Sequence, residues 1–418
     1  MLLDAIGAAT ETLVITYTGA DEHTGHPCPP AVPLAEVLDA LDRTTAAPVR
    51  DQVVTHHPLQ PFDVKNVRPG DLVPGRPFTF DPAALAAAEA SAGPRCSPTV
   101  FISGPLPAAP ATDVSVADLL DFFKDPVKGF FRALDCTLPW DVDTVEDAMP
   151  VELDALQEWT VGDRMLRDML RGMHPDAAAN AEWRRGTLPP GRLGMRKATE
   201  IRDRARELAV AALRHRDADG DGDGEAHDVD VGLGAGRRLA GTLAPVYGAR
   251  SVAVGYSKLG PKHALASWIG LVALAAQRPG RAWTSVCIGR GKNKNSVAQR
   301  FFVAPPDPVA VLRDLVALYD AGRREPLPLP LKTSCAWAEA RRHGDDPVAA
   351  AQDKWRSTTF HPGDDAERAH VRVWGKRAPL SVLLVPPRAG EEVPGEDTRL
   401  GALSARLWLP VLAGERNP

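Results

Sequence analysis

Positive side chains gather between residues 281 and 300, where a polar turn joins two predicted strands. The basic and aromatic residues of this segment are Arg281, Trp283, Arg290, Lys292, Lys294, Arg300 and Phe301. Lysine and arginine neutralise phosphate groups, and aromatic rings stack on bases, so this combination could contact DNA. A solvated turn without a ligand is the alternative, and the residue types leave both interpretations open.

A second basic cluster lies between the predicted helices at 151–172 and 198–214. It consists of Arg184, Arg185, Arg192, Arg196 and Lys197. The same two interpretations apply to it, a contact with DNA phosphates or a solvated charged surface. The net charge of the chain is −5, so DNA could bind only to such local patches or inside a channel shared with partners.

Two segments imitate metal sites without completing them. Aspartates at alternate positions from Asp217 to Asp221 imitate the start of an EF-hand loop, but Asp228 stands where that loop needs a bidentate glutamate. Two histidines and a cysteine between His23 and Cys28 supply three zinc ligands and lack a fourth. We expect a flexible acidic loop and a surface loop here, and no metal site.

The composition indicates an ordinary globular protein, and the sequence has no motif of an ATP-driven motor. Of the 418 residues, 44% are hydrophobic and 25% are charged. No apolar run reaches the roughly 20 residues that a membrane helix needs, and residues 1–4 do not begin a signal peptide. The five cysteines are scattered, which favours a cytoplasmic location. The sequence has no GxxxxGK(S/T) loop, which excludes ATP binding by a P-loop.

Hydrophobic spacing and turn residues predict both helices and strands. Helices are expected over residues 2–10, 34–41, 116–123, 126–134, 151–172, 198–214, 262–277 and 307–322. Strands are expected over residues 12–17, 229–233, 237–245, 251–256, 282–289, 297–304 and 371–374. Residues 45–114 contain many prolines and are expected to be extended, up to Ser115 as the N-cap of a helix. This order of elements predicts an α/β or α+β fold.

Five segments, in this order, resemble the C-terminal part of the RecC family, the gamma subunit of the RecBCD helicase–nuclease. They are residues 4–19, 57–63, 120–131, 186–194 and 403–410. For example, LDFFKDPVKGFF at residues 120–131 is similar to the family pattern FWxxPVRxFF. Each segment alone is a weak signal, but five in the correct order, distributed over nearly the whole chain, are specific. The N-terminal half of the family, with most of its helicase-like domains, is expected to be missing from this sequence.

The resemblance implies an α/β protein in which the end of a helicase-like domain is followed by a degenerate PD-(D/E)xK nuclease-like domain. It places the helicase-like remnant at residues 1–50, an extended connector at 51–114 and the nuclease-like domain at 115–418. In motor relatives an arginine stabilises the transferred phosphate, whereas residues 7–9 here are Gly-Ala-Ala. The helicase-like part is therefore expected to be inactive.

The same resemblance locates the positions where an active nuclease of this class has its ligands. Active relatives carry an acid on one strand and an acid-x-lysine pattern on the next, which bind Mg²⁺ and activate water. Here Ala244 and Gly255 stand at the acidic positions and Ser257 at the lysine position. Lys258 follows, but alternation along a strand directs it to the opposite face. No nuclease activity is expected of a site without carboxylates.

The resemblance implies a non-catalytic, DNA-binding scaffold subunit of exodeoxyribonuclease V. Such a subunit joins RecB-like and RecD-like subunits, splits duplex DNA ends and guides single strands during double-strand-break repair by homologous recombination. ATP and Mg²⁺ would be used by the partner subunits, and this chain would need no cofactor. One alternative is an autonomous metal-dependent nuclease of the PD-(D/E)xK class, which needs an acid-x-lysine pair. Another is a protein-interaction module without DNA contact, in which the turn at 289–300 is buried under a partner.

Overall fold

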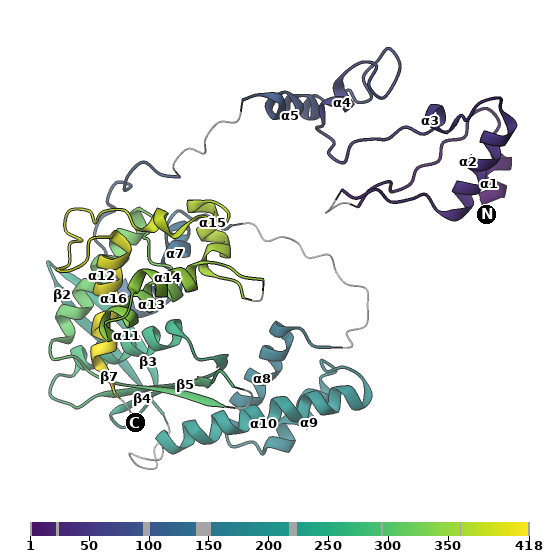
Figure 1. The fold of residues 1–418 in the computed structure, drawn as a ribbon. Helices are drawn as coiled ribbons and strands as arrows, with labels where there is room; N and C mark the ends of the chain where they lie inside the picture. Colours follow the sequence, from purple (N-terminus) through teal and green to yellow (C-terminus); the bar gives the residue numbers. More distant parts are fainter. Residues whose placement is uncertain are drawn as a thin grey trace. The chain divides into compact units, whose positions relative to one another are not determined.

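The computed structural model describes residues 2–21, 25–94, 101–138, 152–216, 224–293, 296–359 and 361–416 (Figure 1). The chain forms two compact units, unit 1 (Met1–Thr99) and unit 2 (Val100–Pro418). In the described ranges, no helix combines the length and the apolar character required to span a bilayer. The predictions that concern His23, Asp217–Asp221 and Lys294 fall outside the described residues.

Unit 1 consists of short helices connected by extended chain. They are α1 (Leu2–Ala8), α2 (Val32–Thr44), α3 (Arg50–Val53), α4 (Val64–Val67) and α5 (Pro82–Ala92). Among its described residues, the buried apolar side chains are those of Leu38 and Ala88, so this unit has little core of its own. Asn66 is also buried, and its Nδ2 donates hydrogen bonds to the carbonyl oxygens of Gln60 and Pro61.

Two predictions for unit 1 are wrong. Residues 12–17 are extended and exposed, with Val14 78% exposed, but they do not form a strand. A strand needs a hydrogen-bonded neighbour, and no described residue of unit 1 pairs with this segment. Residues 45–114 are not extended throughout, because Asp81 accepts a hydrogen bond from the backbone N–H of Ala83 and begins α5 with Pro82 at its first position. The helices predicted over 2–10 and 34–41 are confirmed by α1 and α2.

The described part of unit 2 contains one mixed sheet of seven strands. They are β1 (Val114–Ser115), β2 (Glu225–Gly234), β3 (Arg237–Tyr247), β4 (Arg250–Lys258), β5 (Thr284–Arg290), β6 (Val297–Val303) and β7 (Glu415–Arg416). The order is β1-β3-β4-β5-β6-β7, with β2 paired to β3. The β1–β3 and β4–β5 pairs are parallel and the others antiparallel, which confirms the mixed α/β class.

Strands β3 and β4 form a fork. They pair only where Val246 faces Ser251 and Tyr247 faces Arg250, directly beside the turn that joins them. Farther along, β3 pairs with β2 on one edge, and β1 takes the other edge at Leu239. The positions that follow the paired ends therefore diverge, because each strand continues with a different neighbour.

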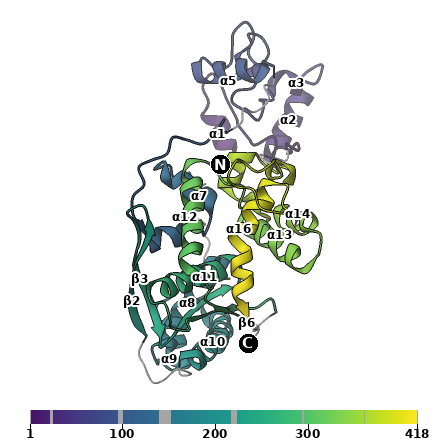
Figure 2. The same cartoon turned by 90° about the vertical axis from the view of Figure 1, so that its left-hand side faces the viewer.

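Helices cover both faces of this sheet (Figures 1 and 2). The helices of unit 2 are α6 (Val116–Phe122), α7 (Pro126–Ala133), α8 (Ala155–Leu170), α9 (Pro175–Arg184), α10 (Gly191–Arg216), α11 (Pro261–Gln277), α12 (Pro308–Arg324), α13 (Leu331–His343), α14 (Pro347–Trp355), α15 (Arg368–Trp374) and α16 (Arg399–Gly414). Met165 of α8, Ile201 of α10 and Tyr256 of β4 share one core. Trp268 of α11 and Trp408 of α16 belong to the core on the opposite face. Unit 2 therefore has three layers.

The N-terminal cap predicted at Ser115 is confirmed, as is the start of a second helix at Pro126. The hydroxyl of Ser115 accepts a hydrogen bond of 2.9 Å from the backbone N–H of Asp118 and begins α6. Asp125 caps α7 in the same way, with Pro126 at the first helical position. The strand predicted over residues 371–374 is wrong, because these residues form the last turn of α15. Valine and tryptophan favour strands, but this segment packs as a helix against α7.

Residues 101–114, which the sequence assigns to an extended connector, are bonded to unit 2. The backbone N–H of Leu106 donates to the carbonyl of Arg324, and the Arg324 Nε donates to the carbonyl of Leu106, both at 2.8 Å. The Arg237 Nε donates to the carbonyl of Thr112 at 2.7 Å. Because these bonds come before β1, the described part of unit 2 begins well ahead of Ser115.

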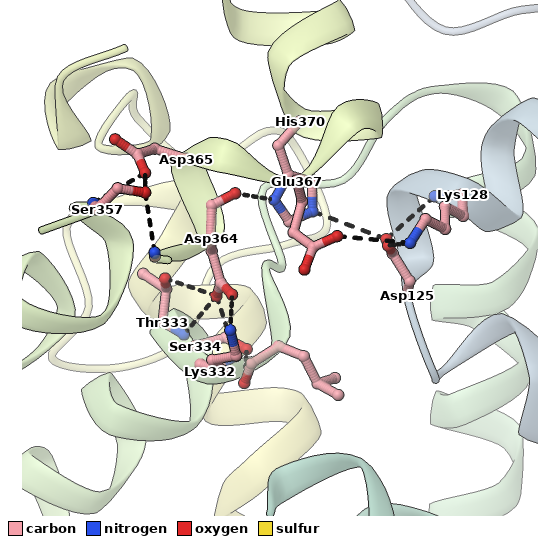
Figure 3. Close-up of polar contacts among 12 residues, drawn as sticks. Asp125, Lys128, Lys332, Thr333, Ser334, Ser357, Asp364, Asp365, Glu367 and His370 are labelled. Atoms are coloured by element: carbon pink, nitrogen blue, oxygen red, sulfur yellow. Dashed lines mark hydrogen bonds and ion pairs between the residues drawn. The ribbon is translucent and has the colours of Figure 1, made fainter. Parts of the chain in front are cut away.

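A buried polar network joins α7, α13 and α15 (Figure 3). The Asp364 carboxylate accepts hydrogen bonds from the backbone N–H groups of Lys332 and Thr333 and from the Thr333 hydroxyl. The carbonyl oxygen of Asp364 lies 2.6 Å from Nδ1 of His370. His370 in turn faces Asp125, the cap of α7. The network holds the N-terminal ends of α7 and α13, which do not contact the sheet through this network.

Candidate nucleic-acid interface

A basic cavity of about 270 Å³ opens between α10 and the far ends of β4 and β5. We refer to it as the basic cavity. Its lining residues are Arg204, Leu208, Lys258, Arg290, Gly291, Lys292, Asn293, Ser296 and Val297. Four of these side chains are cationic, and they come from a helix, a strand end and a turn. Converging positive groups of this kind suit a phosphate ligand.

The fold explains why these side chains meet. Lys258 and Arg290 are register partners at the ends of the parallel strands β4 and β5, so they lie next to each other. Arg204 and Leu208 are one turn apart on α10, and therefore share a face of the helix. Neighbouring Ala205 is fully buried, which holds this stretch of α10 against the sheet.

Glu158 of α8 holds the cations behind the basic cavity in place. Its carboxylate lies 2.5 Å from Lys197, 2.6 Å from Arg204 and 3.6 Å from Arg290. Burial acts to raise the pKa of Glu158, but the hydrogen bond and charge of Lys197, with the charges of Arg204 and Arg290, outweigh it and lower the pKa. Glu158 is thus an ionised counter-ion shared by several basic groups, and it does not cancel all of them.

Arg290 is positioned from a second side as well. Its guanidinium lies 4.7 Å from the ring centroid of Tyr256, a cation–π contact. Tyr256 is fully buried, and burial raises the pKa of its hydroxyl although Arg204 and Arg290 act in the opposite direction. The buried Tyr256 ring therefore does not neutralise the charge of Arg290, and it holds the guanidinium in one position.

Trp159 lies beside this group of charges. It follows Glu158 on α8, is 36% exposed, and its Nε1 donates a hydrogen bond of 2.9 Å to the hydroxyl of Ser257. Ser257 directly precedes Lys258, which lines the basic cavity. The indole is therefore tethered at one end and partly accessible to solvent, next to a basic recess.

The DNA-contact candidates between residues 283 and 300 occupy different environments in the structure. Arg290 and Lys292 both line the basic cavity, whereas Lys294 lies outside the described residues. Trp283 was expected to stack on bases, but this interpretation is wrong: it is 1% exposed and its Nε1 donates to the carbonyl of Arg278. A ring enclosed in the core cannot meet a base.

Arg300 was also expected to contact DNA, but its charge is engaged inside unit 2. Its Nε and Nη2 each lie 2.6 Å from the carboxylate of Glu415, so the pair is bidentate and joins β6 to β7. Burial acts to lower the pKa of Arg300, but the hydrogen bonds and charge of Glu415 outweigh it and raise the pKa. The geometry assigns Arg300 to the sheet edge and not to the basic cavity.

The second basic cluster is only partly available for a ligand. Arg185 pairs with the fully buried carboxylate of Glu182, which also accepts bonds of 2.9 and 2.6 Å from Arg164. Arg184 and Arg192 are exposed. Arg185, although exposed, is therefore paired within the end of α9, while Arg164 of α8 joins α8 to α9 through the same carboxylate. Arg184 and Arg192 stay candidate DNA contacts.

The degenerate nuclease positions lie on the fork of β3 and β4. Ala244 is on β3, while Gly255 and Ser257 are on β4 beyond the paired ends. Within the described ranges, no three His, Cys, Asp or Glu side chains come together as a group that could hold a metal ion. Ser257, at the lysine position, accepts the hydrogen bond of Trp159 instead.

Three residues of the interface had no role in our sequence predictions: Trp159, Arg204 and Lys258. The helix predicted over 198–214 contained Arg204, but its hydrophobic face gave no reason to select one arginine among several. Lys258 was expected on the strand face opposite the nuclease positions and was not assigned to DNA binding, and it lines the basic cavity. Its neighbour Arg290 is brought to it only by the parallel pairing of β4 with β5, which sequence spacing does not reveal.

The fold and the basic cavity define an α/β protein with four cationic side chains converging on one cavity. A family model described as the RecC C-terminal domain matches residues 111–342, more than half of the chain, so the chain belongs to this family. It is 73% identical over 415 residues to the RecBCD enzyme subunit RecC of Mycobacterium tuberculosis H37Rv. It is 61% identical over 416 residues to the RecBCD enzyme subunit RecC of Mycolicibacterium smegmatis. These matches cover 99% and 100% of this chain but 38% of each relative, so the chain spans little more than a third of their length.

Proposed function

We propose that this chain is a non-catalytic, DNA-binding part of a RecBCD-type exodeoxyribonuclease V complex, acting in the cytoplasm. It would join RecB-like and RecD-like subunits, help to split duplex ends and guide the separated strands in double-strand-break repair by homologous recombination. The partner subunits would use ATP and Mg²⁺. Membership of the RecC C-terminal domain family and the names of the two mycobacterial relatives support this proposal.

One observation carries the non-catalytic part of the proposal. Ala244, Gly255 and Ser257 occupy the positions where a PD-(D/E)xK nuclease has its acids and its lysine, and none of them offers a carboxylate. Two of these positions lie on β4, the strand that ends at the basic cavity with Lys258. A fold of this kind would keep its phosphate-binding groups while losing its metal ligands, and so bind DNA without cutting it. In the same proposal, residues 1–50 are the end of a helicase-like domain and residues 115–418 a degenerate nuclease-like domain.

The test is binding of a forked DNA duplex by the 418-residue chain at two salt concentrations, with and without Mg²⁺. We expect affinity to fall steeply between about 50 and 200 mM salt, without cleavage, because phosphate contacts release counter-ions. Replacing both Arg290 and Lys292 by alanine should reduce the dependence of log K on log salt by about 1–2. Arg206→Ala is the matched control, since Arg206 is exposed on α10 and does not line the basic cavity.

Two outcomes would overturn the proposal. Mg²⁺-dependent degradation of DNA by the chain alone would show the autonomous nuclease. Failure to bind DNA, together with co-purification with a RecB-like protein, would show a protein-interaction module.

A further inference from the structure

We propose that the basic cavity holds a backbone phosphate of single-stranded DNA and that Trp159 stacks on a base of the same strand. This inference rests on the proposed DNA-binding function and specifies its ligand. The residues that carry it are Trp159, Arg204, Lys258, Arg290 and Lys292.

The shape of the basic cavity favours a single strand over a duplex. Its volume of about 270 Å³ is just below the range of small-ligand pockets, so it has room for a phosphate with part of its sugar. A duplex is stiff, with a persistence length of about 150 base pairs, and keeps its bases paired, so it would not seat one phosphate in this recess and also offer a base to a nearby aromatic ring. A single strand rotates about its backbone bonds and can place one phosphate inside.

The charge of the basic cavity fits a phosphodiester. Arg204 and Arg290 present planar guanidinium groups, and Lys258 and Lys292 add two ammonium groups on the same lining. The Asn293 amide and the Ser296 hydroxyl supply further polar groups to the lining. Two carboxylates contact these four cations, Glu158 at Arg204 and Arg290 and Glu200 at Arg204, so an excess of positive charge remains for a ligand.

Trp159 supplies what phosphate contacts alone lack, a surface for a base. Its Nε1 is bonded to Ser257, so the ring gives up little conformational freedom when a base stacks on it. Its neighbour in sequence, Glu158, contacts Arg204 and Arg290, and its hydrogen-bond partner Ser257 directly precedes Lys258, so both anchors of the indole adjoin residues that line the basic cavity. A positive recess with an adjacent aromatic ring is the usual arrangement for binding single-stranded nucleic acid without reading its sequence.

The inference is tested with fluorescence anisotropy on the full chain. The probes are a labelled thymidine oligomer of about 12 nucleotides and a blunt duplex of the same length. The variants are Trp159→Ala, Trp159→Phe and the double substitution Lys258→Ala with Lys292→Ala. The controls are Trp183→Ala, because Trp183 is 38% exposed on α9 away from the basic cavity lining, and Arg206→Ala.

We expect Trp159→Ala to weaken binding of the oligomer about tenfold, and Trp159→Phe to keep most of the affinity because a ring remains to stack. The lysine double variant should weaken oligomer binding and lower the slope of log K against log salt by about 1.4. Both controls should bind like the original protein, and circular dichroism identifies any variant that fails to fold.

Three results separate the possible failures. Unchanged oligomer binding by Trp159→Ala, or equal losses for oligomer and duplex, would overturn this inference and leave the proposed function standing. An original protein that binds neither probe would overturn the proposed function as well. Equal affinity of Trp159→Phe and Trp159→Ala would show that Trp159 acts through its bond to Ser257 and not by stacking, which also overturns the inference.

Discussion

His370 and Asp125 face each other across two helices, with Nε2 of His370 lying 3.7 Å from Oδ1 of Asp125. Both side chains are largely buried, at 4% and 16% exposure. Burial acts to lower the pKa of His370, but its interactions with Asp125 outweigh this effect and raise the pKa. Burial likewise acts to raise the pKa of Asp125, yet His370 and then Lys128 lower it. Each group therefore favours the charged form of the other.

A pH dependence of stability follows from this pair. The contribution of His370 is complete below its unfolded pKa of about 6.5 and is lost as the pH rises through the raised pKa of the folded state. The contribution of Asp125 is lost at the other end, as the pH falls through its lowered pKa. We expect His370→Gln to reduce the free energy of unfolding by about 1–3 kcal/mol at slightly acidic pH and by less at alkaline pH. Urea titrations of both proteins at several pH values measure this, and a difference independent of pH would contradict it.

Arg399 should be among the most sensitive positions for stability. Its side chain is 6% exposed and binds Glu325, which is 7% exposed, at 2.8 Å, and Glu391 at 2.7 Å. Removing the guanidinium leaves two buried carboxylates with fewer partners, so Arg399→Ala should cost about 3–5 kcal/mol of unfolding free energy. The exposed pair of Arg206 and Glu207 is the comparison, and Arg206→Ala should cost less than about 1 kcal/mol. Denaturant titrations of the two variants would contradict this if their losses were similar.

Arg300→Ala should affect stability and leave DNA binding unchanged. The bidentate pair with Glu415 joins β6 to the short final strand β7, and its loss should cost about 1–3 kcal/mol. Because Arg300 is absent from the lining of the basic cavity, affinity for single-stranded DNA should remain within about twofold. Urea titration and anisotropy on the same sample test both parts. If Arg300→Ala binds DNA more weakly but is as stable as the original protein, the prediction is wrong and Arg300 contacts DNA.

Gly162 is required for the close approach of α8 to β4. A Cβ atom at this position would overlap the ring of Tyr256, which is fully buried and cannot move aside easily. We expect Gly162→Ala to lower the unfolding free energy by about 1–3 kcal/mol, although alanine favours the helix. Gly270→Ala in α11 is the control, because its nearest neighbour would be Leu243 at an ordinary 3.6 Å. There, we expect no loss, or a gain of up to about 1 kcal/mol from helix propensity, measured by thermal unfolding.

Local signals in the sequence predicted local structure well. Ser115 was identified as a helix cap because a cap depends on residues two or three positions away, and the structure confirms it. The helix predicted to begin at Pro126 is confirmed as well. The strand at 371–374 was wrong because β propensity is overridden by the packing of α15, which no nearby residue indicates.

The candidate site was less predictable than the elements that carry it. Arg290 and Lys292 were selected from the density of charge in one turn, and they do line the basic cavity. Trp283 and Arg300 belong to the same stretch, but one faces the core and the other faces Glu415, more than a hundred positions along the chain. Charge density identifies a segment, whereas the direction of each side chain depends on partners distant in sequence.

Strand β1 has a practical consequence for anyone who wishes to shorten this protein. Val114 and Ser115 pair with β3 at Leu239 and Ala240, and the preceding residues anchor to Arg324 and Arg237. A truncation that removed everything before Ser115 would leave the backbone of β3 without its partner at Leu239, and an unpaired strand edge promotes self-association. A shortened chain that begins ahead of Leu106 would keep β1 paired with this edge of β3.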